Sequence, residues 1–173
     1  MSGNNQELDR LLEAAKKKDC EAAFKLGQMY YSGDGVKQNT KQALKWFTKA
    51  AKTPAAFGAQ YKVGTMYFTG DGVRGNHKQA LKWYLKAAKQ GYADCQDGVG
   101  RIFLLGGGNV ATNYKKALSW FIKAAEQGHV DAQFNAGLMY ATGGQGVKID
   151  LGKSKFWYTK AAEQGHEQAK AKL

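Results

Sequence analysis

The chain has 173 residues, of which 43% are hydrophobic and 23% charged, and this composition excludes a disordered protein. Its 22 glycines and single proline exclude collagen-like and proline-rich chains, and two cysteines are too few for a disulfide framework. The formal net charge of +12 favours an acidic partner.

The N-terminus carries no recognisable targeting segment. Residues 1–7 contain neither a basic stretch nor an apolar run, and no later segment approaches the roughly 18 apolar residues of a membrane-spanning helix. We therefore expect a cytoplasmic protein without membrane insertion, or an exported one if a leader has been removed. The first apolar positions, around Leu11, Leu12, Ala14 and Ala15, predict a capping helix over residues 5–18.

A tandem repeat of about 37 residues follows the capping helix. The four tryptophans are spaced by 37 residues, and three other sets of residues keep nearly the same step. These sets are Trp46, Trp83, Trp120 and Trp157; Val36, Val73, Val110 and Val147; Gly27, Gly64, Gly100 and Gly137; and the Ala-Ala pairs beginning at Ala50, Ala87, Ala124 and Ala161. The spacing predicts repeats at 20–56, 57–92, 93–129 and 130–166, with a truncated terminal helix at 167–173.

Each repeat contains two helical patterns separated by a glycine-rich turn. In the first repeat, apolar residues recur at helical spacing over 22–32, and a second apolar stripe runs over 40–52. Thr40 is a candidate N-cap of the second helix. Gly91, Gly128 and Gly165 are expected to end the second helices of the later repeats.

A glycine also recurs in the middle of every first helix, where it costs up to about 1 kcal/mol relative to alanine. This repeated cost predicts close helix–helix approach at Gly27, Gly64, Gly100 and Gly137, with the Ala-Ala pair of the second helix as the expected counterpart. The third repeat departs most from the pattern, because Asp97-Gly98 lies in its first helix and three glycines form its turn at 106–108. We expect it to be the least stable repeat.

The combined pattern A-x-x-x-L-G-x-M-Y-x-x-G-x-G-V…K-A-L-x-W-F-x-K-A-A-x-x-G resembles the Sel1-like repeat, a relative of the tetratricopeptide repeat. The resemblance covers residues 20–165. It implies an all-α fold, an α/α solenoid of four helix-turn-helix repeats that forms one domain and a right-handed superhelix with a concave groove. It also implies a role as an assembly or signalling adaptor.

The sequence contains no convincing catalytic, cofactor or metal site. Gly152-Lys153-Ser154 resembles the end of a phosphate-binding loop, but Val147 stands where such a loop needs its first glycine, so a helix start is favoured. His129 and His166 occupy equivalent repeat positions and indicate a structural turn rather than metal ligands or a general base. We therefore expect a protein that is not an enzyme and has no cofactor.

The predicted partner site is the concave groove. If the first helices line it, the side chains opposite their core face point into it, and many of these are aromatic or aliphatic. The groove residues are Phe24, Gln28, Tyr31, Tyr61, Thr65, Phe68, Arg101, Leu104, Leu105, Phe134 and Leu138. Phe24, Tyr61 and Phe134 occupy one column, and packing against the neighbouring repeat is the alternative interpretation of that column.

The basic charge follows the second helices. Lys45, Lys49, Lys82, Lys86, Lys123 and Lys160 are predicted to form an outer basic stripe, which is most simply a solvated face. The favoured function is a monomeric scaffold or adaptor that binds an acidic peptide or protein in the groove. Two alternatives stay open: polyanion or nucleic-acid binding through the outer lysines, and immunity-type or inhibitory binding of a single enzyme.

Overall fold

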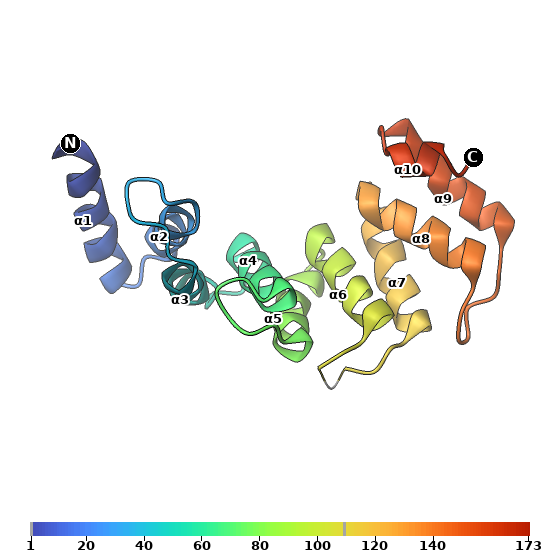
Figure 1. The fold of residues 1–173 in the computed structure, drawn as a ribbon, viewed down its shortest axis with the longest axis horizontal. Coiled ribbons are helices and arrows are strands. Elements are labelled where there is room, and N and C mark those ends of the chain that lie inside the picture. Colours follow the sequence, from blue (N-terminus) through green and yellow to red (C-terminus); the bar gives the residue numbers. More distant parts are fainter. Residues whose placement is uncertain (1, 109) are drawn as a thin grey trace. The chain divides into compact units, whose positions relative to one another are not determined.

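The computed structural model describes residues 2–108 and 110–173, and this part of the chain contains ten helices (Figure 1). The helices are α1 (Ser2–Lys16), α2 (Cys20–Ser32), α3 (Thr40–Ala50), α4 (Phe57–Thr69), α5 (His77–Ala88), α6 (Ala93–Leu105), α7 (Tyr114–Ala125), α8 (Val130–Thr142), α9 (Leu151–Glu163) and α10 (Glu167–Lys170). The predicted all-α repeat architecture is confirmed. Its four helix pairs are α2/α3, α4/α5, α6/α7 and α8/α9.

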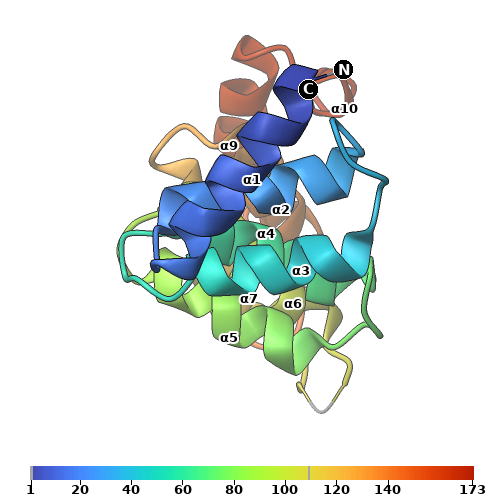
Figure 2. The ribbon, with the colours of Figure 1, turned by 90° about the vertical axis from the view of Figure 1, so that its left-hand side faces the viewer.

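The chain divides into two compact units, residues 1–87 and residues 88–173, which are described separately. In the first unit, α1 lies against α2 as the predicted capping helix (Figure 2). In the second unit, the short helix α10 packs on α9. Both ends of the repeat array are therefore covered by a helix that is not part of a complete repeat.

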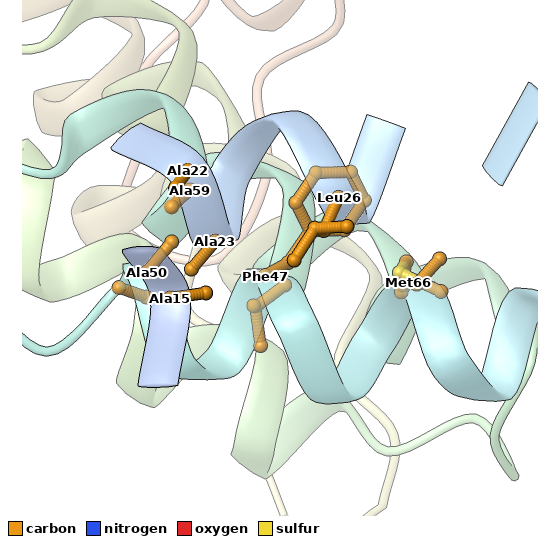
Figure 3. Packing of buried hydrophobic residues seen from close by; sticks show 11 residues of the cluster. Ala15, Ala22, Ala23, Leu26, Phe47, Ala50, Ala59 and Met66 are labelled. Atoms are coloured by element: carbon orange, nitrogen blue, oxygen red, sulfur yellow. The ribbon is translucent and has the colours of Figure 1, made fainter. Parts of the chain in front are cut away.

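Small side chains dominate the core of the first unit. Ala15, Ala23 and Ala50 are almost completely buried around Leu26 and Phe47 (Figure 3). Alanine side chains allow the helix backbones to approach closely, and the aromatic ring fills the space that remains. The second unit repeats the arrangement, with Phe121 buried among alanines of α7 and α8.

The mid-helix glycines face aromatic rings, so the expectation that the Ala-Ala pairs are their counterpart is wrong. A Cβ atom on Gly27 would lie 2.5 Å from Cδ1 of Phe47, and one on Gly100 would lie 2.7 Å from Cδ1 of Phe121. Such distances leave no room for a methyl group. Gly64 faces Tyr84 and Gly137 faces Tyr158 in the same way. The close approach itself is confirmed in all four repeats.

The second helices begin with a side-chain cap one residue before the predicted one. The Oδ1 atom of Asn39, not the Thr40 hydroxyl, accepts a hydrogen bond of 3.0 Å from the backbone N–H of Gln42. The equivalent residues Asn76, Asn113 and Asp150 cap α5, α7 and α9. Each of the four capping residues also donates its own backbone N–H to a carbonyl of the preceding helix, at 2.7–2.9 Å. One residue per repeat therefore caps the second helix and closes the turn.

Buried glutamines connect the first helices α4, α6 and α8 to the chain before them. The Nε2 atom of Gln96 donates to the carbonyl of Ala88 at 3.1 Å, and that of Gln133 donates to Ala125 at 3.1 Å. Their Oε1 atoms accept hydrogen bonds from Gln127 and Gln164. These polar side chains satisfy carbonyl groups at the ends of second helices, which would otherwise be costly to bury.

Candidate interaction surfaces

The predicted groove residues of the first unit lie on α2 and α4 with different exposures. Gln28 and Tyr31 are exposed, whereas Phe24, Tyr61, Thr65 and Phe68 are half-buried. The Phe24 ring lies 5.5 Å from that of Phe47, and the Tyr61 ring lies 6.0 Å from that of Tyr84. These aromatic side chains therefore pack against the second helix of their own repeat and leave only part of each ring on the surface.

Tyr31 connects the first repeat to the turn of the second. A hydrogen bond with the Asp71 carboxylate, followed by burial, raises the pKa of the Tyr31 hydroxyl. The Lys62 ammonium lies 5.8 Å from the centre of the ring, and 38% of Tyr31 is still exposed. Further along α4, Phe68 stacks on His77 at 5.0 Å. Because these contacts already hold the Tyr31 ring, it loses little conformational entropy when a partner binds to it.

In the second unit, the predicted groove residues lie on α6 and α8. Arg101 and Leu105 are exposed, and Leu105 is 60% accessible. Leu104, Phe134 and Leu138 are half-buried. The Phe134 ring stacks on His166 at 4.5 Å and lies 5.6 Å from Tyr158. Phe134 thus contacts two other rings of its own unit.

Asp97 occupies the third repeat's place in the column of Phe24, Tyr61 and Phe134. The side chain is buried, and burial raises the pKa of its carboxyl group although His129, Asn135 and Arg101 favour the ionised form. The Nδ2 atom of Asn135 donates to Oδ1 of Asp97 at 3.1 Å. The third repeat therefore holds a buried carboxyl group where the others place an aromatic ring.

The two equivalent histidines have the structural role that their position predicts. The Nδ1 atom of His129 accepts from the backbone N–H of Ala132 at 3.1 Å, and His166 accepts from Ala169 at 3.2 Å. Their Nε2 atoms face Asp94 and Asp131 at 3.5 and 3.8 Å. Each histidine thereby caps the helix that follows it.

An apolar pocket opens where α3 meets α4. The first turn of α4 carries small residues: Ala56 provides no side-chain cap of the kind that Asp19 and His129 provide, and Gly58 stands where Asp94 and Asp131 stand. These small residues leave a cavity of about 330 Å³ between Phe24 and the start of α4. The remaining lining is Cys20, Glu21, Ala50, Thr53, Ala55, Phe57 and Ala59.

A basic recess of about 310 Å³ adjoins this pocket and shares Cys20 and Thr53 with it. Lys18, Lys49 and Lys52 contribute positive charge to the recess. The carboxylate of Asp19, which also lines it, accepts hydrogen bonds of 2.9 and 3.0 Å from two backbone N–H groups of α2. An apolar opening therefore lies directly beside a cationic one.

The outer lysines lie beside the repeated tryptophans. The ammonium groups of Lys49, Lys86 and Lys123 lie 5.0, 4.0 and 4.4 Å from the ring centres of Trp46, Trp83 and Trp120. In the fourth repeat, Lys160 pairs with Glu163 at 3.2 Å, and Lys45 and Lys82 are exposed. Cation–π contacts of this type contribute about 0.5–1 kcal/mol each at the surface and give this stripe a structural role.

Neither metal-binding groups nor membrane-spanning helices occur in the described residues. No cluster of three or more His, Cys, Asp or Glu side chains there could hold a metal ion. None of the helices in 2–108 and 110–173 combines the length and apolar character needed to cross a bilayer.

The two cysteine thiols differ in accessibility. Cys95 is completely buried, and burial, together with the nearby Asp94 carboxylate, raises its thiol pKa to about 12. We expect a thiol reagent such as DTNB at pH 8 to modify Cys20 in the folded protein and to reach Cys95 only in denaturant. In a Cys20→Ser variant the folded protein should give no rapid reaction. Rapid modification of both thiols in the native chain would contradict this burial.

Comparison with known proteins identifies the repeats. The family model for the Sel1 repeat matches residues 20–52, 58–92, 93–129 and 130–166. A Sel1-like repeat-containing protein of Acanthamoeba polyphaga mimivirus is 47% identical over 45 residues, which are 26% of this chain and 8% of that protein. The chain therefore spans a small fraction of this curated relative.

Solved structures of other proteins share the fold. A Sel1 repeat protein from Oxalobacter formigenes is 32% identical with a TM-score of 0.78, covering 94% of this chain and 70% of its own. The protein c5321, a protective antigen of uropathogenic Escherichia coli, is 27% identical with a TM-score of 0.66, covering 96% of this chain and 43% of its own. With four matched repeats over most of its length, the chain belongs to the Sel1 repeat family.

Proposed function

We propose that the protein is a non-enzymatic scaffold that binds an acidic segment of another protein on its first unit. Sel1 repeats commonly serve as protein-interaction scaffolds. The observation that carries the proposal for this chain is the apolar pocket of about 330 Å³ beside Phe24. Its volume falls at the lower end of the range typical of ligand pockets, about 300–1,000 Å³.

The lining of the pocket and of the adjoining recess supports a partner that is both apolar and acidic. An apolar side chain of the partner enters the pocket, and flanking carboxylates lie over Lys18, Lys49 and Lys52. Glu21, at the edge of the pocket, is itself paired with Lys25 at 3.5 Å. The anchored ring of Tyr31 extends the same first-helix surface along α2. Buried aromatic and aliphatic anchors of this kind provide most of the affinity of peptide complexes.

The internal repeats supply a variant that tests this proposal without disturbing the fold. Gly58→Asp introduces the residue that the third and fourth repeats carry at the same position, and a Cβ there meets Phe24 at an ordinary 3.6 Å. Peptides selected from a displayed random library on the purified chain serve as probes. We expect acidic peptides with an apolar anchor to bind Gly58→Asp at least about tenfold more weakly, because the new carboxylate places charge in the apolar pocket.

Gly58→Ala is the matched control, since it adds a methyl group without charge. It should keep the affinity within a few fold and stabilise α4 slightly. Gly58→Asp should also remain as stable as the parent, because an acidic residue favours a helix N-terminus. If every selected peptide binds Gly58→Asp as tightly as the parent chain, the pocket is not the binding site.

A further inference from the structure

The fourth repeat exposes large apolar side chains where other repeats are polar. Phe156 is 53% exposed and Ile149 is 63% exposed. The positions equivalent to Phe156 are Lys45, Lys82 and Ser119, and those equivalent to Ile149 include Gln38 and Thr112. All five of these polar residues are exposed. Because the same fold accepts polar residues at these sites, Phe156 and Ile149 are not required for folding.

A recess lies beside these side chains within the second unit. It has a volume of about 510 Å³ and is formed by α7, Tyr140 of α8, the loop that precedes α9 and the first turn of α9. Leu118, Ile122 and Ile149 give it apolar walls. Lys153 lines the recess, and Phe156 follows three residues later, so the two side chains are neighbours on the surface of α9.

The charge around this recess is positive. Lys115, Lys148 and Lys153 all contribute to its lining. Asp150 also lines it, but its Oδ1 atom accepts from the Lys153 backbone N–H at 3.0 Å and its Oδ2 atom lies 3.1 Å from the Lys153 ammonium group. The negative charge of Asp150 is therefore compensated within the protein, and the lysines Lys115 and Lys148 add positive charge to the edge of an apolar floor.

We propose that this α7–α9 surface, formed by the recess and Phe156, is a second docking site that takes an acidic protein segment with leucine or phenylalanine side chains. Apolar side chains of the partner contact Leu118, Ile122, Ile149 and Phe156, and its carboxylates face Lys115 and Lys148. A second copy of the chain fits poorly, because each copy carries a formal charge of +12 and would bring lysines against lysines. Nucleic acid also fits poorly, since aliphatic walls offer no stacking surface for bases.

The repeats again provide conservative test variants. Phe156→Lys and Ile149→Thr install the residues found at Lys82 and Thr112, so helicity and the melting temperature should stay at parent values. Peptides selected from a displayed random library on the purified full chain are the probe. We expect one class, rich in Asp or Glu and in Leu or Phe, to bind the double variant at least about tenfold more weakly in fluorescence anisotropy.

A control variant and further binding measurements separate this site from the first one and from other occupants. Gly58→Asp should leave this peptide class unaffected, so failure at either site can be recognised independently. The proposal is overturned if no acidic-apolar peptide loses affinity in the double variant. It is also overturned if sedimentation shows a dimer that Phe156→Lys abolishes, or if a DNA oligonucleotide or anionic vesicles bind in place of peptides with the same dependence on Phe156.

Discussion

Replacing Gly64 by leucine is expected to lower the free energy of unfolding by about 3 kcal/mol or more. A Cβ atom at this position would lie 2.5 Å from Cδ1 and Cε1 of Tyr84. Tyr84 is buried, and its hydroxyl lies 3.0 Å from the Thr65 hydroxyl, so the ring cannot move aside without losing a hydrogen bond. Urea unfolding followed by circular dichroism measures the change.

The neighbouring glycine on the same helix provides the control. Gly58→Ala adds a methyl group in ordinary contact with Phe24, so it should be neutral or stabilising, whereas Gly64→Ala should already destabilise. Combining Gly64→Ala with Tyr84→Leu should cost less than the sum of the two single changes, because the smaller side chain makes room. An unfolding midpoint for Gly64→Leu equal to that of the parent would refute the close contact.

The second large effect concerns Asp97 and depends on pH. We expect Asp97→Asn to stabilise the protein by about 1–2 kcal/mol at pH 7, because it removes a carboxyl group whose ionised form is disfavoured by burial and keeps an acceptor for Asn135. Burial is the largest influence on the carboxyl pKa and raises it above the usual 3.8. An acid with a raised pKa in the folded state contributes stability fully below its unfolded pKa and loses that contribution as the pH rises through the folded pKa.

The advantage of Asp97→Asn should therefore be present at neutral pH and disappear as the pH approaches 3.8. Thermal unfolding of the parent and the variant across this pH range measures the difference in their stability. The other carboxyl groups contribute equally to both proteins, so their contributions cancel in this difference. Glu126→Gln, which changes an exposed carboxylate at the end of α7, should leave the pH profile close to that of the parent. A constant difference between Asp97→Asn and the parent at every pH would contradict a raised pKa.

Periodicity alone predicts the repeats, because hydrophobic spacing and recurring glycines are local properties of the chain. It does not predict what faces each glycine. The ring of Phe47, rather than Ala50-Ala51, lies against Gly27, since the contact depends on how the two helices cross. The N-cap of α3 is Asn39 and not the predicted Thr40, although the sequence contains a signal for Asn39. Asn39 recurs as Asn76, Asn113 and Asp150, and this column would have identified the cap from the sequence.

Periodicity also does not predict the contacts made by the candidate interaction residues. The groove prediction placed Phe24, Tyr61 and Phe134 opposite the core face, but their rings reach the second helix of their own repeat. The pocket beside Phe24 results from missing side chains at Ala56 and Gly58, and a missing side chain gives no periodic signal. Comparing repeat columns would have revealed both Gly58 among acidic residues and Phe156 among polar residues.

The buried glutamines bear on how such a chain can change its length. Gln133 donates to a carbonyl of the preceding repeat and accepts from Gln164 of its own repeat, and Gln96 does the same with Ala88 and Gln127. The third and fourth repeats thus each carry their own acceptor and their own donor for the junction. Duplication of one of these two repeats leaves every such pair complete, whereas a partial insertion leaves a buried amide without its hydrogen-bond partner. Gene rearrangement in whole-repeat steps is therefore the route by which an array of this kind can lengthen without a new core.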